Sequence, residues 1–413
     1  MVSEEGGEKP MMLAGLLLLS GWGWAALAEK GKPTLGKAVV GAVACCGGWF
    51  LLLALIGIRW QPWLAALPLL VGLALAFLHV GTLRLALQSR PAHAVAAVVA
   101  LVAVSRLPAW GWDFRYQWGL KAKVFTAFGG FASAWLANPE VSFANPHYPP
   151  LWPTLLAFAM HLGHSAEHAA GMWTSLLRVG LASACWSLAF RGEPWQRWLA
   201  AALGFLAPVL FRPFFSGYAE PLLAFLLASA VVVTTSERGP STGPLWGLYS
   251  LLGLAKGEGL LWLACLGAVG WRRWEKPQRL AFLLSFLPAL AWFSWALRNA
   301  PGTGVVELIW ERFVPRLLEL PSALLHAGPE ALLAVLAFGL AVLASWGHTP
   351  LAKASLGFAF GLAVVYLAGP YPLPWWLANS LVRVLAVPVP ALLASGLVYQ
   401  KLGPLAPPGE PAA

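Results

Sequence analysis

Charged side chains are scarce in this sequence of 413 residues. They make up 11% of it, whereas hydrophobic residues make up 59%. Soluble domains carry about 25% charged residues, so this composition excludes a soluble globular enzyme and a disordered chain. A chain this apolar is expected to meet lipid along most of its length. The sequence therefore predicts an all-α polytopic integral membrane protein.

Cysteine is also rare, and several familiar motifs are missing. The four cysteines lie in apolar stretches without a CxxC spacing, which excludes a disulfide scaffold and a thiolate metal site. No GxxxxGK[ST] loop occurs, which argues against an ATP-driven pump of that type. Lys and Arg total 27 against 17 Asp and Glu, but no basic run alternates with aromatics. We therefore expect no nucleic-acid partner, and attribute the basic excess to loops held on the cytoplasmic face.

Apolar runs predict about 12–14 transmembrane helices. The predicted spans cover residues 11–28, 38–58, 63–83, 92–107, 170–190, 198–211, 218–235, 244–255, 258–271, 280–298, 329–346, 354–369 and 379–399. Several are short for a hydrocarbon core of about 30 Å, which indicates broken or partly buried helices. The run over 151–163 reaches only about 20 Å as a helix, so we expect it to be re-entrant or interfacial.

Clusters of Lys and Arg in short loops predict the orientation of the chain. Such clusters occur in 30–37, 191–197 and 272–279, and cytoplasmic loops are enriched in these residues. This orientation puts a first large outer loop at 108–150 and a second at 299–328. Other cations then fall on the outer side, near carboxylates, which suggests a site that handles an anion.

The same pattern predicts three parts of the chain. N-terminal spans cover 1–91, a transmembrane core covers 92–400, and a short Pro-rich cytoplasmic tail covers 401–413. We expect the protein in the cytoplasmic membrane, in contact with membrane lipid, with its site facing outward.

The largest polar island lies in the first outer loop, in the segment WGWDFRYQWGLKAKVF. From Asp113 to Phe128 the apolar residues have helical spacing, which predicts an amphipathic helix on the membrane. Asp113 precedes its first turn, where a carboxylate can cap free N–H groups. The alternative is a general base that takes a proton from an acceptor hydroxyl.

His147 and Tyr148 follow in HYPPL, where two prolines stiffen the chain. One alternative is a structural turn with an interfacial tyrosine. The other is a stiff segment that points both side chains into the same cavity as Asp113. His161, His164 and His168 have the spacing of one helical face, which leaves two alternatives: a metal site or a polar interfacial turn. Residues 305–320 predict an interfacial helix.

Ionisable residues also interrupt the later apolar runs. Glu220 stands in GYAEP, Lys256 and Glu258 in LAKGEGL, and Arg383 in the last predicted span. Charges inside a membrane segment are costly, and they indicate function by default. For Lys256 and Glu258 the alternative is a self-neutralising pair. For Arg383 the alternatives are a cation that reaches the headgroups and a guanidinium that grips a lipid phosphate with two bonds.

The ordered set WDxxxxWxxKAKxF, NPxYPPLxP, GYAE, AKGEG and NSLxR resembles bacterial membrane glycosyltransferases of the C superfamily. These enzymes are related in architecture to protein O-mannosyltransferases and to aminoarabinose transferases of lipid A. The resemblance covers about residues 106 to 400 and implies a polyprenyl-phosphate sugar donor and chemistry on the outer face.

The resemblance also implies roles for individual residues. The catalytic carboxylate of the first outer loop is Asp113, and the donor cavity is lined by Lys256, Glu258 and Arg383. Many relatives carry two adjacent acids in the first loop, whereas Phe114 follows Asp113 here. No cofactor is therefore certain, and a divalent metal is an open alternative.

Together these observations predict a hexosyl- or pentosyltransferase that uses a lipid-phosphate sugar donor and inverts the anomeric carbon. The acceptor is a hydroxyl of a glycan, lipid or protein. Asp113 is its expected base, and Lys256, Arg383 and Lys121 are expected to bind donor phosphate. His147, Tyr148, Glu220 and Glu258 are expected to position the substrates. The alternative is a transporter or flippase of a lipid-linked or anionic solute, which would place such charges near the bilayer midplane with two-sided access.

Overall fold

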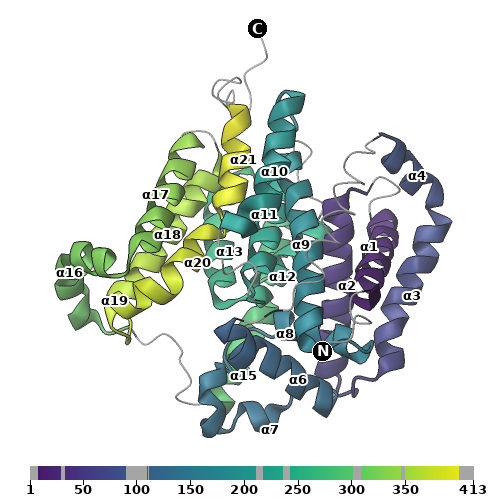
Figure 1. Cartoon of the computed structure of the whole chain (residues 1–413), viewed down its shortest axis with the longest axis horizontal. Coiled ribbons are helices and arrows are strands. Elements are labelled where there is room, and N and C mark those ends of the chain that lie inside the picture. The colour runs from purple at the N-terminus through teal and green to yellow at the C-terminus, as the bar shows by residue number, and fades with distance from the viewer. Residues whose placement is uncertain are drawn as a thin grey trace.

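The computed structural model describes residues 8–28, 33–89, 109, 111–210, 217–235, 242–300, 308–345 and 349–399. Every regular element in these ranges is a helix (Figure 1). The predicted span over 92–107 and the tail over 401–413 lie outside the described residues.

The N-terminal part is a bundle of helices at one side of the molecule (Figure 1). Its elements are α1 (Glu8–Ala28), α2 (Leu35–Leu55), α3 (Pro62–Leu78) and α4 (Val80–Ser89). Small residues let α1 and α2 approach closely, because a Cβ on Gly21 would lie 2.0 Å from the carbonyl oxygen of Ala38. Trp24 Nε1 also donates to the carbonyl of Pro68 at 3.0 Å, which joins α1 to α3.

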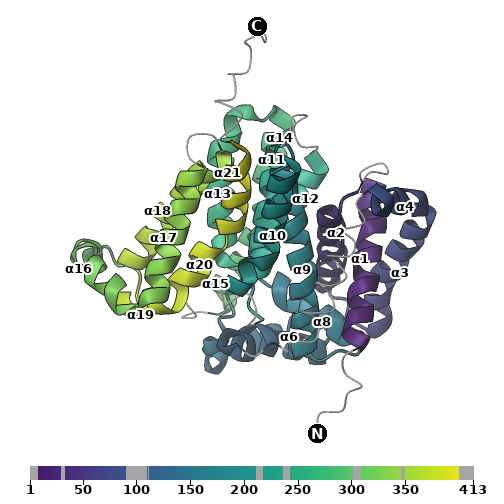
Figure 2. The same ribbon diagram turned by 45° about the horizontal axis from the view of Figure 1, so that its top comes forward.

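Short elements form a layer at one end of the bundle (Figure 2). They are η2 (Phe114–Trp118), α6 (Gly119–Phe128), α7 (Ser133–Leu136), η3 (Pro139–Ala144) and α8 (Leu151–His161). The helix predicted from Asp113 to Phe128 is present as η2, which has π-helical turns, and α6. The 11 residues of α8 reach about 16 Å, and all side chains from Leu151 to Ala159 are buried. Protein rather than lipid therefore surrounds this short helix.

The central part consists of helices that pack side by side behind this layer. They are α9 (Ala166–Leu188), α10 (Pro194–Leu210), α11 (Glu220–Thr234), α12 (Thr242–Ala255), α13 (Gly257–Gly270), η5 (Trp271–Arg273), α14 (Lys276–Leu284) and α15 (Leu287–Asn299). The predicted span over 280–298 is divided between α14 and α15. Pro288 lies in the first turn of α15 and lacks an N–H, which removes one helical hydrogen bond, yet both helices belong to one apolar segment, Lys276–Asn299.

The C-terminal part packs against the central helices on the side away from α1–α4 (Figure 1). It contains η6 (Trp310–Arg312), α16 (Phe313–His326), α17 (Pro329–Ala344), α18 (Pro350–Ala368), α19 (Leu373–Trp376), η7 (Leu377–Leu381), α20 (Val382–Ala386) and α21 (Val389–Tyr399). Within the described residues, the helix predicted over 305–320 corresponds to η6 and α16, which together run from Trp310 to His326. Arg316 anchors it by donating to the carbonyls of Gly369 and Tyr371, both at 2.7 Å.

Five described helical segments are long and apolar enough to cross a membrane, or six if η6–α16 and α17, bent by 111°, form one span. Several predicted runs fold instead as shorter apolar helices or meet at breaks, such as the one at Lys256 between α12 and α13. The layer from η2 to α8 lies at the opposite end of the bundle from α14 (Figure 2).

Candidate active site

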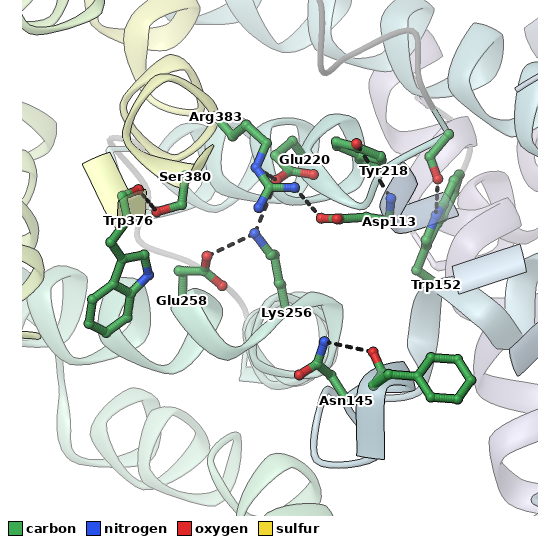
Figure 3. A network of polar contacts seen from close by, with 12 residues as sticks. Asp113, Asn145, Trp152, Tyr218, Glu220, Lys256, Glu258, Trp376, Ser380 and Arg383 are labelled. Atoms are coloured by element: carbon green, nitrogen blue, oxygen red, sulfur yellow. Dashed lines mark hydrogen bonds and ion pairs between the residues drawn. The ribbon is translucent and has the colours of Figure 1, made fainter. Parts of the chain in front are cut away.

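Five charged side chains that lie far apart in the sequence meet at one place in the fold (Figure 3). Asp113 precedes η2, and Glu220 is the first residue of α11. Lys256 and Glu258 lie at the break between α12 and α13, and Arg383 belongs to α20. These five residues, Asp113, Glu220, Lys256, Glu258 and Arg383, are called the charged network from here on. They lie at or near the ends of helical elements that are distant in the chain.

Asp113 and Arg383 form the first part of the charged network. The Asp113 carboxylate accepts a hydrogen bond from Nη1 of Arg383, and Nε of Arg383 lies 3.7 Å from Oε1 of Glu220. The Asp113 side chain makes no capping hydrogen bond, so the predicted alternative of a helix cap does not apply. Arg383 likewise points inward to protein carboxylates and does not simply reach for the membrane surface.

Lys256 and its two glutamates form the second part. The Lys256 ammonium lies 3.0 Å from Oε1 of Glu220 and 2.8 Å from Oε1 of Glu258. The backbone of Lys256 is extended, with φ −164° and ψ 165°, which ends α12 and turns this side chain into the site. Lys256 and Glu220 are buried, with 5% and 1% of their side chains exposed. Removing Glu220 would leave the buried Lys256 with one carboxylate partner, Glu258, and a less balanced buried charge.

Exposure separates the charged network into an accessible edge and a buried support. The side chains of Asp113, Arg383 and Glu258 are 19%, 18% and 22% exposed. Behind them, Oε2 of the buried Glu220 has no hydrogen-bond partner among the described residues. The network holds three carboxylates and two cations, a formal sum of −1. A ligand at the accessible edge would thus meet one guanidinium and two carboxylates.

Lys121 belongs to a separate cluster. Its ammonium donates to the carbonyl of Asn145 at 2.6 Å and lies 5.6 Å and 5.9 Å from the ring centroids of Trp118 and Tyr148. Within the described residues it forms no ion pair with a carboxylate. Burial lowers the pKa of Lys121 to about 7. The structure thus places Lys121 in an aromatic cage and not in direct contact with the other predicted phosphate-binding cations.

Tyr148 contributes a ring to this cage and also lies near the charged network. Its ring stacks on Trp118 at 5.4 Å between centroids, and burial raises its pKa to about 12, with smaller effects from the charges of Lys256 and Glu258. The ring of His147 packs edge-on against Tyr148, and the His147 carbonyl accepts a hydrogen bond from Trp292 at 3.1 Å. Tyr148 thus lies near enough to the charged network for its charges to act on the phenol.

Three residues missed by the sequence analysis hold the site together (Figure 3). The ring of Tyr218 lies 5.1 Å from the Arg383 guanidinium, and its hydroxyl accepts a hydrogen bond from the Asp113 N–H at 3.4 Å. Trp152 donates to the carbonyl of Gly217 at 3.0 Å, which fixes the turn before Tyr218. The only available signal was that Tyr218 stands two positions before Glu220 in GYAE.

The three histidines of the connector do not form a metal site. Among the described residues, no group of three or more His, Cys, Asp or Glu side chains could hold a metal ion. His161 packs edge-on against Phe50 and Trp60, whereas His168 Nδ1 lies 2.8 Å from Ser165 Oγ. These histidines therefore have separate surroundings in the fold.

Fold and site together define an all-helical membrane protein with a charged network at the end of its bundle. No protein-family model matches the chain, and no curated protein matches it. The structure is similar to that of ArnT from Cupriavidus metallidurans bound to undecaprenyl phosphate, with 16% sequence identity and a TM-score of 0.47. The match covers 77% of this chain and 61% of that one, so this chain spans about three fifths of the matched structure. The function proposed below rests on the site itself.

Proposed function

We propose that this protein is a membrane glycosyltransferase that moves a sugar from a polyprenyl-phosphate donor to a hydroxyl acceptor on the outer face of the cytoplasmic membrane. The observation that carries the proposal is the contact between Asp113 and Arg383 at the accessible edge of the charged network. A carboxylate that can accept a proton lies directly beside a guanidinium that can hold a phosphate. The ordered motifs that resemble glycosyltransferases of the C superfamily supply these same residues.

The proposed reaction is a single displacement. Asp113 takes the proton of the acceptor hydroxyl, and the hydroxyl oxygen forms a bond to the anomeric carbon. The bond from that carbon to the carrier phosphate breaks, and the phosphate leaves with the electron pair. Arg383 contacts the leaving phosphate and stabilises its negative charge, and the positive charge of the buried Lys256 adds to this stabilisation without a direct contact. One in-line displacement inverts the anomeric configuration.

In this proposal, binding of the donor phosphate also activates the base. Its carboxylates outnumber its cations by one, three against two, so a phosphate must compete with protein carboxylates for Arg383. When the phosphate takes the guanidinium, Asp113 loses its partner beside the sugar. Donor binding would thereby release the base that activates the acceptor. Glu220 and Glu258 keep Lys256 in place during this exchange.

Sugar transfer by the purified protein tests the proposal. The protein in detergent receives a panel of radiolabelled polyprenyl-phosphate sugars with a membrane extract as acceptor, alongside Asp113→Asn. The matched control is Glu330→Gln, which changes an exposed acid at the start of α17 in the same way. Label that moves to a product with the wild type and Glu330→Gln, but not with Asp113→Asn, supports the proposal. Full transfer by a folded Asp113→Asn protein overturns the role of Asp113. Donor translocation in liposomes without transfer would support the flippase alternative instead.

A further inference from the structure

We infer that Tyr218 is a positioning residue that holds both the base and the phosphate-binding cation of this site. The inference rests on the proposed function, because it assigns a part in that reaction to a residue that touches the two reacting groups. Two separate parts of the Tyr218 side chain make the contacts. The hydroxyl meets Asp113, and the ring meets Arg383.

The hydroxyl acts on the backbone of Asp113. It accepts the Asp113 N–H at 3.4 Å, at the start of η2, where a backbone N–H has no partner inside its own helix. Asp113 makes no capping contact of its own. The tyrosine oxygen therefore fixes the position from which the Asp113 carboxylate extends.

The ring acts on the guanidinium of Arg383. A cation that lies 5.1 Å from an aromatic face is attracted to it, and the flat guanidinium is also kept from turning. Arg383 projects from α20 (Val382–Ala386), which contains no aromatic residue of its own. The Tyr218 ring therefore helps to aim Arg383 at both Asp113 and Glu220.

Tyr218 is itself rigidly held, as this role requires. Gly217 before it has φ +80°, and Trp152 of α8 donates to the Gly217 carbonyl at 3.0 Å. Ala219 and Glu220 after it are buried at the start of α11. The turn thus connects α8 and α11 to the start of η2, and it places Tyr218 beside the pair of Asp113 and Arg383 (Figure 3).

Two substitutions separate the contacts. Tyr218→Phe removes the hydroxyl and keeps the ring, whereas Tyr218→Leu removes both. For Tyr218→Phe we expect kcat to fall about tenfold with an unchanged KM for the donor, because only the base is misplaced. For Tyr218→Leu we expect the donor KM to rise about tenfold as well, because the cation–π contact is lost. The matched control is Tyr249→Phe, a buried tyrosine of α12 whose hydroxyl contacts Thr234 outside the network.

A second readout does not depend on transfer. The rate at which phenylglyoxal modifies Arg383, followed by mass spectrometry, reports how well this guanidinium is held. We expect Tyr218→Leu to raise that rate several-fold, and Tyr218→Phe and Tyr249→Phe to leave it near the wild-type value. Unchanged Arg383 labelling in a folded Tyr218→Leu protein would overturn the inference. If the wild type transfers no sugar while the labelling changes as expected, the proposed function fails and the positioning role stands.

Discussion

The guanidinium of Arg383 and the carboxylate of Asp113 form an ion pair although 270 positions separate the two residues in the chain. The contact joins the layer of short helices that contains η2 to α20, near the C-terminal end of the helical bundle, so the site exists only in the folded protein. Both side chains are partly exposed, at 18% and 19%, and Glu220 and Lys256 support them from behind. A double-mutant cycle can therefore measure whether the pair acts as a unit.

We predict that Asp113→Asn and Arg383→Gln are not additive in sugar transfer. Asp113→Asn should lower kcat/KM by about 10²- to 10⁴-fold, the usual range for loss of an acid–base group. Arg383→Gln should lower it by about 10²- to 10³-fold, the usual range for loss of a group that stabilises developing charge. The double variant should have little less activity than the less active single variant. If the two residues work as a unit, the first substitution already abolishes their joint contribution. Initial rates over a range of donor concentrations provide the measurement. Losses that multiply would show that the two residues act independently.

The two glutamates around Lys256 should differ in their effect on stability. Glu220 is 1% exposed and also faces Arg383, whereas Glu258 is 22% exposed. We expect Glu220→Ala to destabilise the protein by about 3–5 kcal/mol, because it leaves a buried ammonium with one carboxylate fewer. Glu258→Ala should cost clearly less, since water can reach this end of the pair. Thermal unfolding in detergent compares the two, and equal losses would contradict the buried position of Glu220.

The pKa of Lys121 predicts a pH dependence of stability. Burial lowers this pKa from its ordinary value of 10.5 to about 7. Between these two values the unfolded chain binds the proton more readily than the folded protein, so stability should rise with pH from about 7 toward 10.5. Below pH 7 both states are protonated, and the full cost of burying the charge is present.

Lys121→Met tests this dependence, because its side chain fills a similar space without a charge. The unfolding temperature of this variant should exceed that of the wild type near neutral pH and change less as pH increases. Lys123→Met is the matched control on the same helix, since Lys123 is 52% exposed and pairs with Glu167. An identical pH dependence of stability in wild type and Lys121→Met would overturn the prediction.

The members of the charged network can be recognised in the sequence, but their contacts cannot. Asp113, Glu220, Lys256, Glu258 and Arg383 stand out because ionisable residues beside or within apolar runs are costly. Which carboxylate pairs with which cation depends on how α11, α13 and α20 pack, and no local pattern encodes that packing. The sequence places Lys121 in the first-loop motif WDxxxxWxxKAKxF, but it could not reveal that its ammonium lies beside the rings of Trp118 and Tyr148.

Other features were hidden for different physical reasons. Tyr218 could not be distinguished from an aromatic residue that anchors a span at the membrane surface. The apolar runs located most helices, and the run over 280–298 lies within one helical segment, Lys276–Asn299, that is long enough to cross a membrane although Pro288 interrupts its hydrogen bonding. A hydrophobic run reports the length of apolar chain and not the continuity of its hydrogen bonds.

A pair of glycine substitutions can test how tightly the turn before Tyr218 is packed. Gly217 and Gly57 have similar left-handed backbones, with φ +80° and +75°. A Cβ on Gly217 would lie 2.5 Å from Cβ of Ala109 and 2.6 Å from a ring carbon of Phe114, whereas a Cβ on Gly57 meets nothing within 4 Å. Gly57→Ala should therefore cost only about 1–2 kcal/mol for the unfavourable backbone conformation. Gly217→Ala carries the same backbone cost and must also displace Phe114, the residue next to Asp113. We expect it to lower the unfolding temperature further and to reduce kcat, while Gly57→Ala keeps wild-type transfer. Equal behaviour of the two variants would show that the turn has room to move and does not fix the position of Tyr218.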